Sequence, residues 1–350
     1  MNENLGTSFV RTVGWALSSS LIFTILLASP AARSQAVSGA IPGDTGSAGM
    51  HSENQCENRG LPNANQLALL RWYSANTVTN VQIGGHPNGA AFDGANVWLV
   101  NAPGDSVTKI RANDSAVLGT FAVGYIPGYG AFDGANVWIT NLGDNTVTKL
   151  RASDGANLGT FPTGKYPWGI TFDGSNIWVG NILDNTVSKI RPSDGATLGV
   201  FPSGSFPIAL AFDGKNIWVT NQGGGNTVTK LRASDGALLG SFPVGKNPVG
   251  VTFDGSSIWV ANQDSNTINQ LSREDGTLIR TIPVGSQPQF IAFDGTYLWV
   301  SNKGGNNVTK LRWCDGKPLG TIPVVGEPFQ MVFDGANIWV VESNGSISKL

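Results

Sequence analysis

The tripeptide Phe-Asp-Gly occurs seven times in this 350-residue sequence, and its spacing constrains the fold more than any other feature. The copies begin at Phe92, Phe132, Phe172, Phe212, Phe253, Phe293 and Phe333, in steps of 40 residues with one step of 41. A Trp stands six residues after each Phe, and an Asn follows three residues after the first six Trp. Such self-similarity is typical of proteins in which copies of one small unit pack against one another.

The third copy shows four short β-runs, at residues 169–172 (GITF), 176–180 (NIWVG), 186–191 (TVSKIR) and 198–201 (LGVF). Asp-Gly pairs separate runs, and Gly accepts the positive φ that tight turns require. Such a meander cannot bury both faces alone, so the copies must stack radially. We therefore expect an all-β, seven-bladed β-propeller of four-stranded antiparallel blades, with Phe172 and Trp178 filling the space between blades.

The ring is predicted to be closed by an N-terminal strand. Only the first three runs of the seventh copy are present up to Leu350. Arg71 lies 21 residues before Phe92, as Arg151 lies 21 residues before Phe172. Residues 77–83 therefore have the register of a fourth strand, and we expect them to pair with residues 347–350. Residues 64–350 would form the propeller, led by a short helix, or alternatively a strand, at 66–73 (QLALLRWY).

Residues 1–36 have the pattern of a cleaved export signal. Arg11 precedes an apolar run over residues 13–28, and Ser34-Gln35-Ala36 offers a signal-peptidase site. A membrane anchor is the alternative, but the run is interrupted by serines and falls short of the ~20 apolar residues that span a bilayer. We expect a flexible linker over 37–63, a periplasmic or extracellular protein, and no membrane attachment after cleavage.

Export leads to a prediction for Cys56 and Cys314, the two cysteines of the sequence. In an oxidising compartment they are expected to form a disulfide, with two free thiols as the alternative. The formal net charge of −2 gives no general attraction to nucleic acid or to anionic lipid.

Residues 216–221 (NIWVTN) and 226–232 (NTVTKLR) resemble the YVTN-type β-propeller repeat family and, more loosely, streptogramin B lyases. The resemblance covers about residues 77–350 and implies the propeller fold. For the lyases it also implies a His-containing, metal-assisted site on the channel face. The sequence has only His51 and His86, so blades two to seven contain no His and that site does not carry over.

Three repeated polar sets have both a functional and a structural interpretation. The motif residues Asp93, Asp133, Asp173, Asp213, Asp254, Asp294 and Asp334 could form a carboxylate ring, but Asp beside Gly is typical of turn capping. The loop acids Asp105, Asp144, Asp184 and Asp264 could bind Ca²⁺, but lack the dense ligand pattern of a calcium loop. The pairs Lys109/Arg111, Lys149/Arg151, Lys189/Arg191, Lys230/Arg232 and Lys310/Arg312 could form a positive belt, or could be solvated pairs in which Arg meets a turn Asp.

The structural interpretation is favoured in each case, so we expect no metal, no cofactor and no catalytic residue in these sets. The loops before each first strand vary between copies while the scaffold stays fixed, which favours a binding site there. Their residues include Phe206, Lys246, Gln289 and Phe329, with Phe206 and Phe329 open to a blade-packing role. The ligand-binding residues that we predict are Tyr125, Tyr129, Lys165, Tyr166, Trp168, Phe290 and Glu327.

The sequence therefore predicts an exported, monomeric binding or scaffold propeller. Its ligand would be a protein, peptide or glycan held at the channel mouth, because aromatic faces beside a cation suit such molecules. The alternatives are a lyase resembling streptogramin B lyase and a nucleic-acid-binding propeller. Apart from Lys165 and Glu327, these loops offer no acid, base or nucleophile, which argues against turnover.

Overall fold

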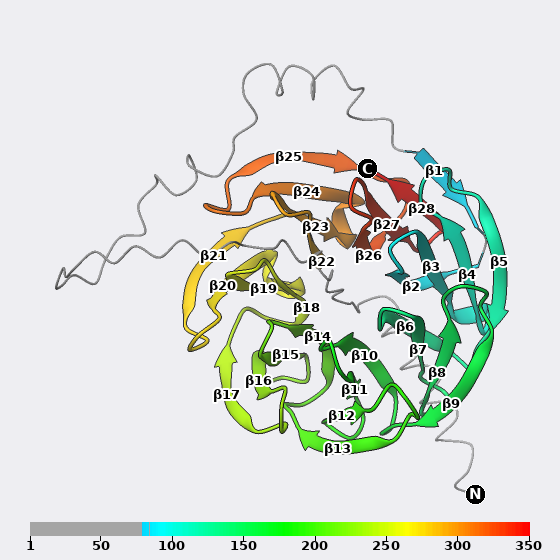
Figure 1. Ribbon diagram of the computed structural model, residues 1–350. Helices are drawn as coiled ribbons and strands as arrows, with labels where there is room; N and C mark the ends of the chain where they lie inside the picture. The colour runs from blue at the N-terminus through cyan, green and yellow to red at the C-terminus, as the bar shows by residue number, and fades with distance from the viewer. Residues whose placement is uncertain (1–78, 84) are drawn as a thin grey trace, which may run out of the picture. The chain divides into compact units, whose positions relative to one another are not determined.

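The computed structural model describes residues 79–83 and 85–350. In this part of the chain, seven separate sheets each contain four antiparallel strands. Figure 1 shows them as blades around a common centre, with the first strand of each blade innermost and the fourth outermost. The described residues contain no α-helix, and three short 3-10 helices lie in the loops. The all-β, seven-bladed prediction is confirmed.

The blades follow one another along the chain. Blade 1 contains β2 (Pro87–Phe92), β3 (Asn96–Asn101), β4 (Ser106–Arg111) and β5 (Val117–Ala122), and blade 2 contains β6 (Pro127–Phe132), β7 (Asn136–Asn141), β8 (Thr146–Arg151) and β9 (Asn157–Pro162). Blade 3 contains β10 (Pro167–Phe172), β11 (Ile177–Asn181), β12 (Thr186–Ile190) and β13 (Thr197–Pro202), and blade 4 contains β14 (Pro207–Phe212), β15 (Asn216–Asn221), β16 (Thr227–Arg232) and β17 (Leu238–Pro243). Blade 5 contains β18 (Pro248–Phe253), β19 (Ser257–Asn262), β20 (Thr267–Ser272) and β21 (Leu278–Pro283), and blade 6 contains β22 (Pro288–Phe293), β23 (Tyr297–Asn302), β24 (Asn307–Arg312) and β25 (Pro318–Pro323). Blade 7 contains β26 (Pro328–Phe333), β27 (Ile338–Glu342), β28 (Ser346–Lys349) and β1 (Thr79–Gln82), and the 3-10 helices are η1 (Ala102–Gly104), η2 (Gln263–Ser265) and η3 (Lys303–Gly305).

Each motif Asp caps its own turn and also holds the Trp of its blade. In blade 3, Asp173 Oδ1 accepts the backbone N–H groups of Ser175 and Asn176, at 2.8 and 2.6 Å. Its Oδ2 accepts the indole Nε1–H of Trp178 at 2.7 Å. The same indole-to-carboxylate bond, 2.7–2.8 Å long, recurs in the other six blades. These carboxylates are thus used in folding, as the turn-capping interpretation predicts.

Neighbouring blades interlock at the turn between the third and fourth strands. Phe161 of β9 packs against Trp138 of its own blade, with ring centroids 5.6 Å apart. The same Phe reaches the turn of blade 3 so closely that a Cβ on Gly195 would lie 1.9 Å from its ring. Gly195 also has a φ of +74°, so glycine is required there by both its backbone and its neighbour.

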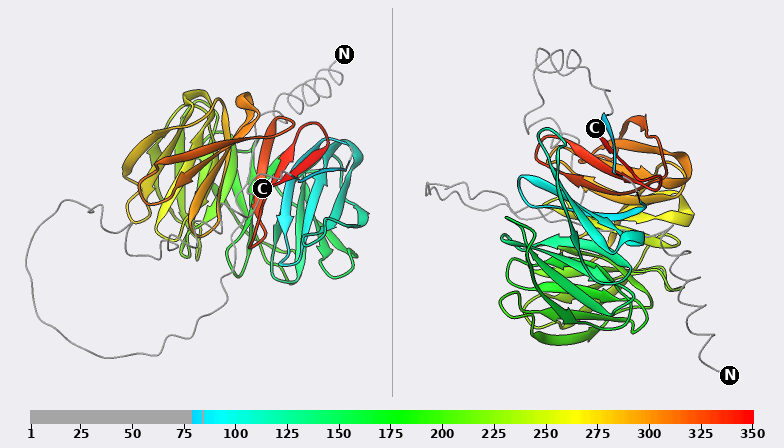
Figure 2. Two further views of the ribbon diagram at one scale, coloured as in Figure 1. Left: turned by 90° about the horizontal axis from the view of Figure 1, so that it is seen from above. Right: turned by 90° about the vertical axis from the view of Figure 1, so that its right-hand side faces the viewer.

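The strand β1 pairs antiparallel with β28, in a register from Thr79 opposite Lys349 to Gln82 opposite Ser346. Figures 1 and 2 both show this strand, drawn in blue, beside the red C-terminal strands. In this register Val81 faces Ile347, as Phe201 faces Val187 in blade 3. Val81 therefore stands where most other blades carry the interlocking Phe. Closure of the ring by this strand stays a prediction, for which the sequence of blade 1 offers a test.

Blade 1 departs from the other turns in the residue that would meet Val81. Five turns have Gly at this position, with φ between +72° and +78°, namely Gly155, Gly195, Gly236, Gly276 and Gly316. Blade 1 has Ser115, at a φ of 62°. A Cβ at each of those glycines would lie 1.9–2.4 Å from the Phe or Ile of the preceding blade. We infer that the smaller Val81 is what leaves room for Ser115.

We expect Val81→Phe to destabilise the fold by about 1–3 kcal/mol, because overpacking against the Ser115 Cβ forces strain. Adding Ser115→Gly to the same chain should recover most of that loss, while Ser115→Gly alone should have a much smaller effect. Urea unfolding of the four chains measures the coupling. If Ser115→Gly changes the free energy of unfolding equally in both backgrounds, β1 does not occupy the fourth-strand position of blade 7.

The predicted signal at 1–36, the linker at 37–63, the helix at 66–73 and Cys56 lie outside the described residues. The Cys56–Cys314 disulfide therefore stays a prediction. We expect the mass of the unreduced protein, after alkylation without reductant, to show no modified thiol, and two alkylated cysteines to appear only after reduction. Two alkylated cysteines in the unreduced protein would contradict the pairing.

Candidate ligand-binding site at the channel mouth

Two sets of loops meet at one end of the propeller. The loops that enter each first strand are bonded to the loops between the second and third strands of the same blade. Leu142 N donates to Ile126 O at 2.9 Å in blade 2, and Gln222 N donates to Phe206 O at 3.0 Å in blade 4. The two loop sets thus open on the same end, which we call the channel mouth, as the sequence predicts.

The predicted site residues divide into exposed and buried groups. Tyr125 is 48% exposed, Lys165 is exposed, and the Glu327 side chain is 49% exposed beside Lys303, with 3.7 Å between Glu327 Oε2 and Lys303 Nζ. By contrast Tyr129, Tyr166, Trp168 and Phe290 are each at most 3% exposed. The structure therefore does not bring the seven residues into a single exposed surface.

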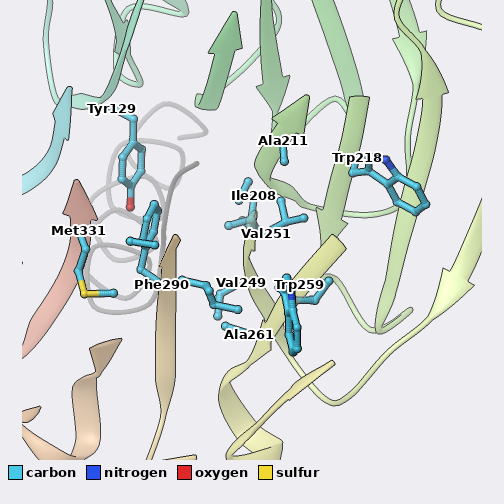
Figure 3. Close-up of a cluster of buried hydrophobic side chains, with 14 of the residues drawn as sticks. Tyr129, Ile208, Ala211, Trp218, Val249, Val251, Trp259, Ala261, Phe290 and Met331 are labelled. Atoms are coloured by element: carbon cyan, nitrogen blue, oxygen red, sulfur yellow. The ribbon is translucent and has the colours of Figure 1, made fainter. Parts of the chain in front are cut away.

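The buried aromatic residues form a packed wall instead. The Trp168 ring lies 5.3 Å from Tyr129 and 6.0 Å from Tyr166, measured between centroids. Figure 3 shows Tyr129 of β6, Phe290 of β22 and Met331 of β26 pointing toward one another between the inner strands. Burial raises the pKa of the Tyr166 hydroxyl to about 12 and also raises the pKa of the Tyr129 hydroxyl, which Trp168 opposes in part. Both hydroxyls therefore stay protonated at neutral pH and offer no base.

Exposed apolar side chains gather on three consecutive blades at the mouth. We call Tyr125, Leu183 and Phe206 the mouth patch; they are 48%, 41% and 36% exposed. Leu183 N donates to Lys165 O at 3.3 Å, so an exposed cationic residue lies beside the patch. Tyr125 and Phe206 are held by close contact, since a Cβ on Gly143 or Gly223 would lie 2.3 or 2.6 Å from their rings. Leu183 was not among the binding residues predicted from the sequence. Phe206 is exposed, which contradicts a blade-packing role for it.

Blades 5 to 7 carry more polar residues at the mouth. The positions equivalent to Tyr166 and Phe206 are Asn247, Gln287 and Glu327 in blades 5 to 7. Lys303 lies under this rim, 5.3 Å above the ring of Phe329, which is 5% exposed and packs as the alternative interpretation predicts. Burial lowers the Lys303 pKa, and the Glu327 carboxylate opposes that shift. The mouth loops therefore expose large apolar side chains in blades 2 to 4, and amide or charged side chains in blades 5 to 7, where Val325 of blade 7 is a further exposed apolar residue, at 64%.

Polar side chains on the inner strands mostly link blades. Hydroxyls of Thr140, Thr220 and Ser301 donate to a backbone carbonyl of the next blade at 2.7–3.0 Å. Gln330 makes a comparable link, because its Oε1 accepts the N–H of Ala90 across blades 7 and 1. Gln289 is different: it is fully buried, and neither amide atom has a hydrogen-bond partner among the described residues.

The loop acids tie adjacent loops together. Asp105 Oδ1 accepts Ile126 N at 2.9 Å, Asp144 Oδ2 accepts Tyr125 N at 2.7 Å, and Asp184 Oδ2 accepts Lys165 N at 2.7 Å. Asp264 Oδ1 accepts Asn247 Nδ2 at 3.2 Å. Residues 79–83 and 85–350 contain no group of three or more His, Cys, Asp or Glu side chains placed to hold a metal ion. The acids thus shape the mouth, which favours the loop-forming interpretation over a calcium site.

The Lys-Arg pairs do not form a free positive belt. Arg111, Arg151, Arg191, Arg232 and Arg312 each pair with the Asp three residues later. Lys109, Lys189 and Lys230 are at most 7% exposed, so the prediction that the lysines are solvated is wrong for them. Each donates to a carbonyl of the next blade, as Lys189 Nζ does to Ala233 O at 2.7 Å. The outer face of the next blade covers them.

Two further observations concern His86 and membrane-spanning helices. His86 is exposed at the rim, with Nδ1 2.6 Å from Ser343 O. Among the residues with described positions, no helix is long and apolar enough to cross a bilayer.

Solved structures show what this chain is similar to. No protein-family model and no curated protein sequence matches it. A streptogramin B lyase structure aligns with a TM-score of 0.68 at 18% identity, covering 77% of this chain and 96% of that one. Virginiamycin B lyase from Staphylococcus aureus gives 0.69 at 20%, covering 78% and 98%, and hydrazine synthase from Kuenenia stuttgartiensis gives 0.68 at 17%, covering 79% and 98%. Identities this low show a shared fold alone, and the YVTN-type resemblance has no matching family model behind it.

Substitution of Trp168 should affect folding as much as binding. We expect Trp178→Ala and Trp168→Ala each to lower the free energy of unfolding by about 3–5 kcal/mol, because both remove a packed indole. Tyr125→Ala, at an exposed position, should change it by less than about 0.5 kcal/mol. Urea unfolding measures all three. A Trp168→Ala chain as stable as the unmodified protein would show that the ring is available to a ligand after all.

Proposed function

We propose that the protein is an exported binding propeller that holds a peptide segment of a partner at the channel mouth, without turning it over. The observation that carries this proposal is the mouth patch of Tyr125, Leu183 and Phe206, three exposed apolar side chains in the mouth loops of the consecutive blades 2 to 4. An exposed apolar cluster bordered by polar residues is typical of an interaction site. The scaffold of the propeller does not need these side chains.

The chemistry of the patch favours a peptide over a glycan. Sugar rings are bound mainly on open aromatic faces, whereas Trp168 is packed against Tyr129 and Tyr166. The patch combines one aliphatic and two aromatic side chains, which suits the mixed side chains of a peptide. Lys165 beside it, and the amides of Asn247 and Gln287 across the mouth, can meet the polar groups of such a segment.

Catalysis finds no support in the described residues. The tyrosine hydroxyls are held protonated, and the loop carboxylates already accept backbone N–H groups. The lyase alternative depends on fold alone, since the similar structures share 17–20% identity with this chain. Binding without turnover remains the simpler activity for this surface.

Export and the monomeric state are part of the same proposal. The pattern of residues 1–36 supports export. The outermost strands of the blades carry exposed side chains, and their pairing with the third strands contains register irregularities, as between Lys149 and Leu150. Both features discourage edge-to-edge pairing with another molecule.

A matched pair of leucines tests the site. Leu183 in the mouth and Leu158 on the outer strand β9 are 41% and 40% exposed. Peptides would be selected from a phage-displayed random library on the purified protein, and their affinity measured by titration calorimetry. We expect Leu183→Ser to weaken the selected peptides about fivefold, by removing apolar contact area, and Leu158→Ser to leave them unchanged.

Several results would refute the proposal. Failure to select any peptide would refute peptide binding, and equal effects of the two substitutions would place the site elsewhere. A glycan array in which binding is lost with Tyr125→Ala would assign a glycan instead. Release of a covalently altered peptide from the protein would refute binding without turnover.

A further inference from the structure

The 41-residue step in the repeat marks a loop that differs chemically from its neighbours. The extra residue falls in the glycine run 223–225, between β15 and β16 of blade 4. The run is exposed and lies at the mouth, where Gly223 N donates to Ser205 O at 3.0 Å. The same Gly223 lies against Phe206 of the mouth patch. The single break in the repeat period is therefore next to the proposed binding surface.

Neighbouring blades show what this loop normally supplies. In blade 2 the residue before Asn145 is Asp144, and its Oδ2 accepts Tyr125 N at 2.7 Å. In blade 3 the residue before Asn185 is Asp184, and its Oδ2 accepts Lys165 N at 2.7 Å. In blade 5 Ser265 Oγ accepts Lys246 N at 2.7 Å. Three blades thus place a side-chain oxygen on the same backbone N–H, and in two of them it is a carboxylate oxygen.

Blade 4 keeps the donor and lacks the acceptor. Ser205 is the residue equivalent to Tyr125, Lys165 and Lys246, and its backbone N–H has no acceptor among the described residues. The residue before Asn226 is Gly225, which carries no side chain. The next residue is held as in the other blades, because Phe206 N donates to Asn185 Oδ1 at 2.9 Å. Phe206 N is therefore held as in the other blades, whereas Ser205 N has no acceptor within the described chain. The neighbouring Asn221 Oδ1 also has no partner among those residues, although its equivalents Asn141 and Asn181 accept Gly124 N and Gly164 N.

We propose that the ligand supplies this oxygen as a carboxylate, bound at the Ser205 N–H over the glycine run. The assignment deepens the proposed function and rests on it: the bound peptide would carry a C-terminal or side-chain carboxylate next to an apolar side chain. Carboxylate oxygens accept backbone N–H groups strongly. The apolar side chain would contact Phe206 and Leu183.

The charges around the loop agree with an anion. Lys165 and Lys246 stand at the equivalent positions of the two adjacent blades, and both are exposed. The loop acids of these two blades, Asp184 and Asp264, already accept Lys165 N and Asn247 Nδ2. Blade 6 also lacks the acid at Gly305, but there Glu327 lies beside Lys303 and would repel an anion. The geometry therefore points to blade 4.

The test compares a peptide acid with its amide. N-acetyl-leucyl-phenylalanine and its C-terminal amide differ only in the carboxylate, and their affinities for the purified protein would be measured by NMR titration. We expect the acid to bind about fivefold tighter. Gly225→Asp should abolish this preference, because it returns a carboxylate to the position held by Asp144 and Asp184. A Cβ at Gly225 has no atom closer than 3.6 Å, so the substitution has room.

Two control variants separate charge from shape. Gly225→Ala adds a side chain without an acceptor, and Asn157→Asp adds a negative charge on the exposed outer strand β9. Both should keep the preference for the acid. If the acid and amide bind equally, or if Gly225→Asp keeps the preference, the carboxylate site is refuted.

The two proposals fail in different ways. Equal binding of acid and amide that is weakened by Leu183→Ser leaves the peptide site intact and refutes only the carboxylate site. No binding of either compound at millimolar concentration refutes the carboxylate site, and the peptide site then depends on the phage selection alone.

Discussion

In blades 1 to 4 and in blade 7, a lysine of the third strand lies over the Trp of its own blade and donates to a backbone carbonyl of the next blade. In blade 3, Lys189 Nζ lies 5.0 Å from the Trp178 ring centroid and 2.7 Å from Ala233 O. Both partners replace the water that an ammonium loses on burial, so the charge is accommodated at a blade interface. The indole cannot rotate, because Asp173 holds its Nε1–H from the other side. In these blades the turn, the Trp and the Lys form one set of contacts that joins a blade to the next, whereas blade 5 has Gln270 opposite its Trp259.

This set of contacts leaves one end of the ring free to vary. In a four-stranded meander the first-to-second and third-to-fourth turns lie at one end, and these contain the capping Asp and the interlocking Gly. The remaining loops lie at the other end, where the backbone hydrogen bonds between them involve no particular side chain. A substitution at an exposed mouth side chain such as Leu183 therefore leaves the blade interfaces intact, while one at Asp173 or Gly195 does not. Folding and binding make separate demands on the sequence.

The sequence predicted the strands, the turns and the role of the motif Asp because these depend on local pattern. It did not predict the burial of Lys109 or Lys189, because alternation along a strand says nothing about which blade covers its face. It also could not separate Tyr166 from Phe206, which have the same loop position and φ values of 56° and 55°. Tyr166 is covered by Trp168 two residues later, whereas Phe206 has Ile208 there and stays 36% exposed. Exposure in the mouth therefore depends on which side chain packs over each loop residue, and the repeat pattern does not specify that packing.

A ring of near-identical blades can bind an asymmetric ligand only where the blades differ. The mouth loops expose large apolar side chains in blades 2 to 4 and at Val325 of blade 7, while the amides and the Lys303–Glu327 pair lie over blades 5 to 7. The one extra residue of the repeat lies in blade 4, at a loop position that carries Asp184 in blade 3 and Ser265 in blade 5. Lengthening a surface loop by one residue costs little closure entropy, so the fold tolerates the change. The sequence of the blade 4 loop can therefore vary to suit a ligand, whereas the Trp, Asp and Lys of the same blade are fixed by the packing of the ring.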